Sequence, residues 1–328
     1  MRIVKILLWS TIAVVVFAAA PAFAQSADPN PSGQAGTTTT QPALPLALPE
    51  LIQRANAALQ AEDYDRALLD YSLFIMLNPT FSRGYSGRAI AYLRRNEVDR
   101  ALADLEVAVS NEGEAPDLRA ALFSLRGRIY NQLQRPDDAL ADLTRAVELL
   151  PSPDMYLERA LILNGMGKLD AALDDIDIAI ELAPTEPLLF LYRGQLYNEA
   201  EDTAAAAAAY HDFVGLIRQQ TVTGQPFQSG RGVLLTLQEG LVVEIPFEGR
   251  SGQRFNAIAR PQQGSQADPL LVVLDPDGTP IRADDDSGGG TIALILDQPL
   301  VRTGTYTLII THSLGGSQGD VGVQIELQ

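Results

Sequence analysis

Tyr64-Asp65-Arg66-Ala67-Leu68 is followed 34 residues later by Val98-Asp99-Arg100-Ala101-Leu102, and this recurrence determines how the chain is organised. Related segments lie at Asp137-Asp138-Ala139-Leu140 and Asp170-Ala171-Ala172-Leu173, with a degenerate copy at Ala204 to Ala209. An arginine precedes each copy by the same interval, at Arg54, Arg88, Arg126, Arg159 and Arg193. A period of roughly 20 to 50 residues indicates a repeat architecture, in which each unit buries its apolar face against its neighbours.

The pattern resembles the tetratricopeptide repeat, a helix–turn–helix unit of about 34 residues. The resemblance covers five copies, at 48–81, 82–119, 120–152, 153–186 and 187–220. Small residues recur where two helices would touch closely, at Ala67, Ala101, Ala139 and Ala172. The resemblance implies an all-α solenoid of helix–turn–helix repeats over 48–220. The second copy carries an insertion around Asn111 to Asp117, which we expect to form a loop.

Two charged columns accompany the repeat. The first helix of each copy carries the arginine, and the second helix of four copies carries an aspartate, at Asp70, Asp104, Asp142 and Asp175. A guanidinium binds a carboxylate in two-point contact, so the columns favour a structural ladder over a site for an anionic ligand. Because an arginine at the hydrated end of the array loses little without a partner, we expect pairing with the preceding repeat: Arg88–Asp70, Arg126–Asp104, Arg159–Asp142 and Arg193–Asp175.

The resemblance also implies that first-helix positions line an inner groove. These positions are Leu59, Ile90, Leu93, Arg94, Arg128, Asn131, Gln132, Asn164, Gln195 and Asn198. Their amides suit the backbone of an extended peptide and their apolar members suit its side chains, although amides also serve simply to solvate a groove. The paired basic residues of chaperone-binding members are not evident, which argues against a cytosolic chaperone partner. We therefore expect a protein or peptide ligand whose identity the sequence does not reveal.

Residues 229–328 lose the helical period and predict an all-β domain after a linker at 221–228. Seven apolar runs separated by turns suit a β-sandwich, at 232–238, 241–247, 254–260, 270–274, 291–297, 305–311 and 321–327. The segments Asp268 to Gly278, Ala283-Asp284-Asp285-Asp286 and Gly304-Thr305-Tyr306-Thr307-Leu308 resemble the bacterial pre-peptidase C-terminal domain, a non-catalytic module of secreted enzymes and surface proteins. The linker predicts that 48–220 and 229–328 each fold alone.

The residues that carry chemistry are few. The chain has no cysteine and two histidines, His211 and His312, which excludes disulfides, thiolate zinc sites and cysteine nucleophiles. Motifs of zinc proteases, serine hydrolases and P-loop enzymes are absent from the sequence. Weak calcium candidates are Asp275, Asp277, Asp284, Asp285 and Asp286, although aspartates in turns more often cap their own backbone. We expect no catalytic residues and no cofactor other than this possible calcium.

The N-terminus has the organisation of a targeting segment. Arg2 and Lys5 precede an apolar run, and Ala22-Phe23-Ala24 places small residues where a signal peptidase cleaves. Residues 1–24 are therefore predicted to be a signal peptide, with an uncleaved membrane anchor as the alternative. Residues 25–47, rich in Pro, Gly, Ser and Thr, are predicted to be a disordered linker. Export without cysteine suits a bacterial protein that is secreted, periplasmic or associated with the cell envelope.

Composition limits the partners. The net charge of −17 repels nucleic acid, and no membrane insertion is expected beyond the signal segment. The leading hypothesis is a non-enzymatic exported scaffold that binds protein or peptide partners through the groove, with the sandwich as an accessory binding or anchoring module. The alternative makes the sandwich an envelope or matrix polysaccharide-binding module carried on a repeat spacer.

Overall fold

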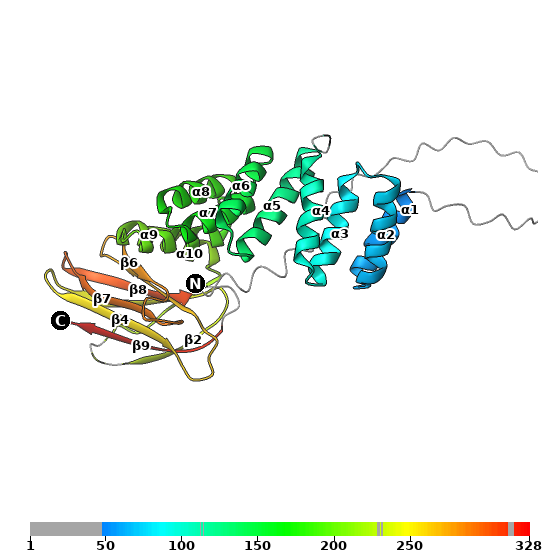
Figure 1. The fold of residues 1–328 in the computed structure, drawn as a ribbon. Coiled ribbons are helices and arrows are strands. Elements are labelled where there is room, and N and C mark those ends of the chain that lie inside the picture. The colour runs from blue at the N-terminus through cyan, green and yellow to red at the C-terminus, as the bar shows by residue number, and fades with distance from the viewer. Residues whose placement is uncertain (1–47, 112, 114, 228–229, 231, 314–317) are drawn as a thin grey trace, which may run out of the picture. The chain divides into compact units, whose positions relative to one another are not determined.

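The computed structural model describes residues 48–328, apart from 112, 114, 228–229, 231 and 314–317 (Figure 1). The predicted signal peptide and the predicted linker at 25–47 lie outside the described residues. The chain divides into two compact units, with the boundary between Pro151 and Ser152. Each unit is described by itself below.

The described residues of the first unit form three helical hairpins. Its helices are α1 (Leu48–Gln60), α2 (Tyr64–Leu77), α3 (Ser82–Arg94), α4 (Val98–Ser110), α5 (Pro116–Gln132) and α6 (Pro136–Leu149). The recurring alanines Ala67, Ala101 and Ala139 are fully buried, as close contact between helices requires. The insertion differs in part from the expected loop, because α5 already begins at Pro116. Proline suits the first turn of a helix, where its missing N–H has no intrahelical partner.

The second unit begins with two more hairpins and continues into the β-domain. Its helices are α7 (Pro153–Gly165), α8 (Leu169–Leu182), α9 (Pro187–Glu199) and α10 (Thr203–Ile217). A Cβ atom on Gly194 of α9 would lie 2.9 Å from the ring of Tyr210 in α10. Glycine at this position therefore lets the two helices approach closely. None of the helices in the described part of the chain is both long and apolar enough to cross a membrane.

The five hairpin turns share one backbone conformation. One residue of each turn has a positive φ, between 58° and 73°: Glu62, Asn96, Gln134, Gly167 and Glu201. Only glycine adopts this left-handed conformation without steric cost. Four of the five repeats nevertheless tolerate another residue there, because the turn is held by the packing of the helices on either side.

Nine strands follow and form two sheets. They are β1 (Gln220–Thr223), β2 (Val233–Leu237), β3 (Leu241–Gly249), β4 (Arg254–Pro261), β5 (Pro269–Leu274), β6 (Pro280–Asp284), β7 (Ala293–Pro299), β8 (Gly304–His312) and β9 (Gly319–Leu327). One sheet has the order β1-β3-β8-β5-β6 and the other β2-β9-β4-β7. All described pairs are antiparallel except β1–β3, which is parallel. The predicted fold class, helical repeats followed by a sandwich, is confirmed.

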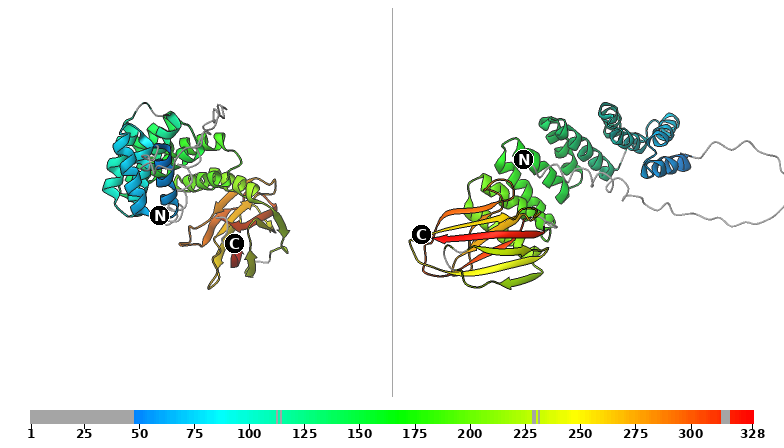
Figure 2. Two further views of the ribbon diagram at one scale, coloured as in Figure 1. Left: turned by 90° about the vertical axis from the view of Figure 1, so that its right-hand side faces the viewer. Right: turned by 90° about the horizontal axis from the view of Figure 1, so that it is seen from below.

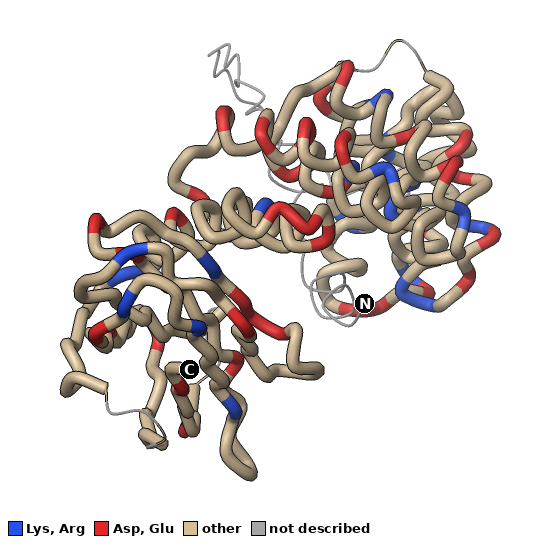
Figure 3. The backbone as a smooth tube through the Cα atoms, turned by 90° about the vertical axis from the view of Figure 1, so that its left-hand side faces the viewer, with Lys and Arg blue, Asp and Glu red and all other residues tan. Residues whose placement is uncertain are grey.

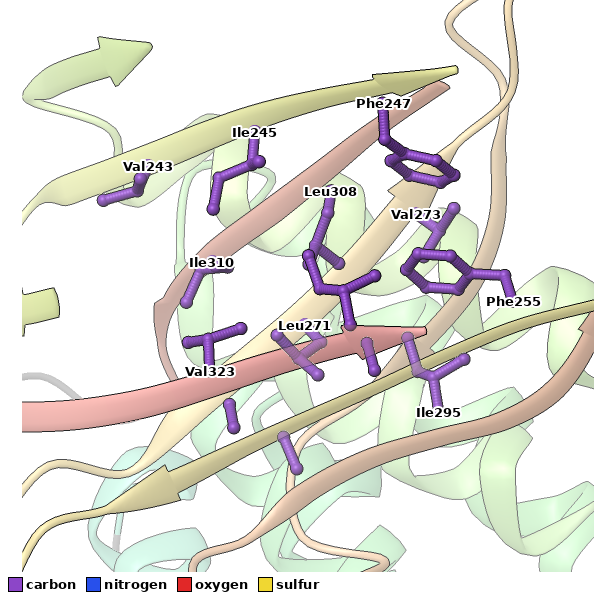
Figure 4. Close-up of a cluster of buried hydrophobic side chains, with 14 of the residues drawn as sticks. Val243, Ile245, Phe247, Phe255, Leu271, Val273, Ile295, Leu308, Ile310 and Val323 are labelled. Carbon is purple, nitrogen blue, oxygen red and sulfur yellow. The ribbon is translucent and has the colours of Figure 1, made fainter. Parts of the chain in front are cut away.

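The inner faces of the two sheets enclose an apolar core (Figure 4). Phe247 of β3 stacks on Phe255 of β4, with ring centroids 4.6 Å apart, and on Tyr306 of β8 at 5.5 Å. Val243 and Ile245 lie on the same side of β3 as Phe247, as expected for residues two apart in a strand. These contacts hold the sheets together without disulfides.

The outer face of the five-stranded sheet is also apolar and packs against α9 and α10 (Figure 2). Fully buried sheet residues in this second cluster are Val242, Leu270, Val272 and Ile309. The helices contribute Leu191 of α9 and Ala206, Ala207, Tyr210, Phe213 and Val214 of α10. The alanine run therefore has a packing role, because small side chains let the sheet approach the helix.

The junction differs from the predicted linker at 221–228. Residues 220–223 form β1, in which Gln220 pairs with Leu241 and Thr223 with Glu244 of β3. The fifth repeat and the sandwich also share the apolar cluster described above. Contact between these segments therefore extends across the position where the sequence indicated a boundary between independent domains.

Candidate functional site

The arginine and aspartate columns form bidentate ion pairs within each repeat. Arg54 donates to Asp70, Arg88 to Asp104, Arg126 to Asp142 and Arg159 to Asp175, through Nε and Nη2 at 2.6–2.8 Å. The four aspartates are buried. The predicted pairing with the preceding repeat is wrong. The prediction of a structural ladder fits the geometry, since the carboxylates are enclosed between helices.

Hairpin geometry explains the pairing. Arg54 lies eight residues before the turn residue Glu62, and Asp70 lies eight residues after it. Residues equidistant from the turn of an antiparallel hairpin lie level with each other, which brings the two side chains together. The other three pairs have the same symmetry about their own turn residues. The position of the two residues relative to the turn therefore decides the pairing, and not the hydration of an unpaired arginine at the end of the array.

Aromatic rings flank several of these guanidinium groups. Arg88 lies 5.9 Å from the ring centroid of Tyr85 and 6.0 Å from that of Tyr92. Arg126 lies between Phe123 and Tyr130 in the same way. Rings three residues before and four residues after the arginine share its side of the helix. Arg88 and Arg126 are thereby held by both rings and carboxylates.

The fifth repeat lacks the aspartate, because Ala209 occupies its position. Arg193 contacts two other carboxylates instead, Asp212 of α10 at 3.0 Å and Asp177 of α8 at 3.5 Å. Both aspartates are more exposed than the ladder aspartates. The predicted Arg193–Asp175 pair does not form, since Asp175 binds Arg159.

The predicted groove residues of the first unit differ in accessibility. We use the term first-helix face for the side of the first helices that carries the ten predicted groove residues. Leu59 of α1 and Ile90 of α3 belong to the buried core, so they contribute little accessible surface. Leu93, Arg128 and Asn131 are half-buried, whereas Arg94 and Gln132 are exposed. The polar members are therefore the accessible ones.

In the second unit, part of the first-helix face is already occupied. Asn164 of α7 and Asn198 of α9 are half-buried, and Asn198 donates to the hydroxyl of Tyr210 at 3.4 Å. Gln195 of α9 donates from Nε2 to Asp285 of the sandwich at 3.1 Å. The side chain of Gln195 is thus engaged by the chain's own carboxylate.

Asp285 is one of the calcium candidates that the sequence predicts, but its contacts give it another role. Its buried carboxylate also accepts a hydrogen bond from the hydroxyl of Tyr210 at 3.1 Å. Burial, followed by the charge of Asp285, raises the pKa of Tyr210 well above its ordinary value. The hydroxyl therefore stays protonated and donates. Asp285 fastens the end of β6 to the last repeat, a role that the sequence did not reveal.

The five calcium candidates do not converge. Asp275 accepts from the backbone amides of Asp277 and Thr279 in the β5–β6 turn, as a turn aspartate does. Asp284 is the last residue of β6, at the other end of the hairpin, and accepts from the amides of Ser287 and Leu294. Within the described ranges, no three carboxylate or imidazole groups gather where they could hold a metal ion. The possible calcium site is therefore not formed by these residues.

Three carboxyl groups beside Asp285 have altered acidity. Burial raises the pKa of Asp268, Asp284 and Asp286, and the charge of Asp285 adds to the rise in each. For Asp286 the pKa rises to about 6. The cluster accumulates negative charge at neutral pH next to the contact between β6 and the last repeat.

We expect the Asp286→Asn substitution to raise stability at pH 7 and to weaken its pH dependence between about pH 4 and 6. An unfolded aspartate releases its proton near pH 3.9, about two units below the folded group. The stabilising contribution of Asp286 is therefore present below about pH 4 and is lost as pH rises through about 6. Because the side chain is only partly buried, solvent screens its charge, and the gain at pH 7 should be about 1 kcal/mol or less.

Thermal unfolding at several pH values measures this effect. Asp174→Asn, which changes an exposed aspartate on α8, is the matched control and should leave the profile unchanged. An identical pH profile for Asp286→Asn and the wild type would contradict the expected titration.

The two histidines support no catalytic site among the described residues. His312 is buried, and its Nε2 accepts a hydrogen bond from the amide of Gly240 at 3.1 Å. This contact ties the end of β8 to the turn before β3. His211 is half-buried on α10. Both positions fit structural roles.

One hollow lies away from the predicted groove residues. It measures about 720 Å³ and is lined by residues near the edge strands β1 and β2, including Phe227, Val233, Leu234 and Ile245. The edge of β2 exposes Leu234 to 65%. Apolar side chains and the amide of Gln225 line the hollow together, and its described lining residues include no titratable side chain.

Comparison with known proteins identifies the repeats. A family model described as tetratricopeptide repeat matches residues 52–118, 86–154 and 124–187. Human tetratricopeptide repeat protein 13 is 28% identical over 136 residues, which cover 40% of this chain and 15% of the relative. Tetratricopeptide repeat protein 36 of Xenopus tropicalis is 32% identical over 107 residues, which cover 33% of this chain and 52% of the relative. The chain thus spans at most about half the length of these two relatives.

Two solved structures are also similar to part of this chain. The crystal structure of YrrB, described as a TPR protein with an unusual peptide-binding site, has 25% identity and a TM-score of 0.44 over 51% of this chain and 84% of that chain. A crystal structure of MamA has 16% identity and a TM-score of 0.47, over 52% of this chain and 91% of that chain. The resemblance of the sandwich to the pre-peptidase C-terminal domain stays a prediction. Residues 52–187, which the family model matches, form tetratricopeptide repeats.

Proposed function

We propose that the protein is a non-enzymatic exported scaffold that binds protein or peptide partners through the first-helix face of its repeats. The observation that carries this proposal is that the two helices of a repeat differ in how their polar side chains are used. The second helix buries its aspartate in the ladder, whereas the first helix leaves Arg94 and Gln132 exposed and Asn131 half-buried. Side chains that are accessible and not used for stability are available for a ligand.

We further propose that the sandwich is an accessory or anchoring module. Its outer face covers α10, the surface on which a sixth repeat would otherwise stack. Terminal repeats of such arrays need a cover for their apolar side. A polysaccharide-binding role has less support, because the rings of Phe247, Phe255 and Tyr306 are buried in the core. Sugar binding by stacking requires exposed rings.

Site-specific photo-crosslinking tests the partner-binding role. A photoreactive residue at Gln132, exposed on the first-helix face, should capture a defined set of envelope proteins, identified by mass spectrometry. The matched control places the same residue at Ala141, exposed on the second helix α6. Equal capture from both positions, or capture from neither, would count against the proposal.

Export is part of the same proposal and rests on the sequence of residues 1–24. We expect the mature protein to begin at Gln25, beyond Ala22-Phe23-Ala24. N-terminal sequencing of protein from the periplasm or medium checks this. A retained Met1 in the membrane fraction would support the anchor instead.

A further inference from the structure

Charge is unevenly divided between the two kinds of helix in the first unit. The first helices α3 and α5 carry six arginines and a single acidic residue, Asp117. The second helices α4 and α6 carry seven acidic residues and two arginines. Acidic residues predominate over the molecule as a whole, which has a net charge of −17 (Figure 3). The first helices of repeats two and three are therefore a basic region of an acidic protein.

Part of this positive charge is not used within the protein. Arg88 and Arg126 are neutralised by the ladder aspartates. Arg83 and Arg94 of α3 are exposed, and neither forms an ion pair with any residue in the described part of the chain. Most other described arginines of the first unit do contact a carboxylate.

Helix geometry places these two arginines on one stripe. Arg83, Ile90 and Arg94 are spaced by seven and four residues, which keeps them on the same side of α3. The eleven residues from Arg83 to Arg94 correspond to about 16 Å along the helix axis. An extended chain covers that distance in about five residues. Ile90, only 6% exposed, and the half-buried Leu93 provide an apolar floor between the two charges.

The fifth repeat shows what kind of group binds to this side of a first helix. Gln195 lies two residues after Arg193, as Ile90 lies two residues after Arg88. At this position Gln195 donates to the carboxylate of Asp285, which comes from a segment about ninety residues away. The same side of a first helix in this chain thus already binds a carboxylate from outside the repeats.

We propose that the α3 part of the first-helix face binds an extended peptide of a partner protein that carries two carboxylate side chains about five residues apart. One carboxylate contacts Arg83 and the other contacts Arg94, and the residues between them lie over Ile90 and Leu93. The inference rests on the proposed scaffold function and specifies the ligand of that face. Charge complementarity favours an acidic ligand, because the two unneutralised arginines attract carboxylates and would repel the positive charges of a basic peptide.

Selection from a phage-displayed library of random dodecapeptides tests the proposal on the mature full chain. Peptides enriched by the wild type should contain pairs of Asp or Glu four to six residues apart. The strongest of them, synthesised with a fluorophore, should bind at least tenfold more weakly when both acids become Asn or Gln. Binding should also weaken as salt rises, since the contacts are between exposed charges.

Two sets of variants locate the site. Arg83→Glu with Arg94→Glu should reduce affinity at least tenfold, and Arg83→Gln with Arg94→Gln should reduce it by a smaller factor. The charge-matched control, Lys168→Glu with Arg250→Glu, changes two exposed cations on other elements and should leave binding unchanged. Circular dichroism verifies that all variants fold, as expected for exposed sites.

The outcomes separate the inference from the function on which it rests. Enriched peptides without acidic pairs, or acidic peptides that bind the double variant as well as the wild type, would overturn the inference while leaving the scaffold function intact. An equal loss of peptide affinity in the control variant would show that affinity follows net charge alone, and this result would also overturn the inference. Failure to enrich any peptide would count against both the inference and the scaffold function. Enrichment of sequences that occur in this chain would overturn the inference of a partner protein, because it would identify a second copy of the chain as the occupant.

Discussion

Replacing Asp142 by alanine is expected to destabilise the repeats around α5 and α6 by about 3–5 kcal/mol. The side chain of Arg126 is only 14% exposed, and both of its contacts with Asp142 are 2.7 Å long. An arginine guanidinium does not release its proton in proteins, so Arg126 stays charged after the carboxylate that also raises its pKa is removed. The substitution leaves a charge enclosed between helices without a carboxylate.

Urea-dependent amide hydrogen exchange, read at α5 and α6, measures this loss without requiring the whole chain to unfold as one unit. Asp138→Ala is the matched control, because its pair with Arg135 is half exposed and should contribute less than about 1 kcal/mol. The double variant Arg126→Met with Asp142→Leu removes both charges and should recover most of the stability. A loss below about 1 kcal/mol for Asp142→Ala would contradict the structural role of the ladder.

The isolated segment 229–328 is expected not to fold, although its sequence has the pattern of a complete sandwich. In the full chain Val242, Leu270, Val272 and Ile309 are fully buried beneath α9 and α10. Exposing four such side chains costs roughly 6–12 kcal/mol, which is comparable to the whole stability of a domain, about 5–15 kcal/mol. The segment also loses β1, which pairs with β3.

Circular dichroism and thermal unfolding of two fragments, 229–328 and 152–328, measure how far the sandwich depends on the helices for its stability. Residues 152–328, which form the second compact unit, should unfold cooperatively with both helical and β signals. In the full chain, Phe213→Ala should lower stability by about 3–5 kcal/mol, because its side chain fills the shared cluster. A cooperative transition in 229–328 alone would restore the view of two independent domains.

The sequence by itself determined the local architecture. Recurrence of short motifs placed the helices of all five repeats, since each helix is specified by its own periodicity and by contact with the nearest neighbours in the chain. The symmetry of Arg54 and Asp70 about Glu62 is also present in the sequence, although the hydration of a terminal arginine predicts a different pairing. Strand runs such as Leu241–Phe247 were visible because their side chains alternate between two faces.

Only the tertiary structure decided what covers the outer face of the sheet. The run Leu270-Leu271-Val272-Val273 is apolar on both sides, a signal for a strand buried on both faces, but it does not say what covers the second face. The contact between Gln195 and Asp285 joins residues ninety positions apart, and no local pattern relates them. β1 and β6 were likewise missed, because short polar strands are stabilised by their neighbours in the sheet and not by their own composition.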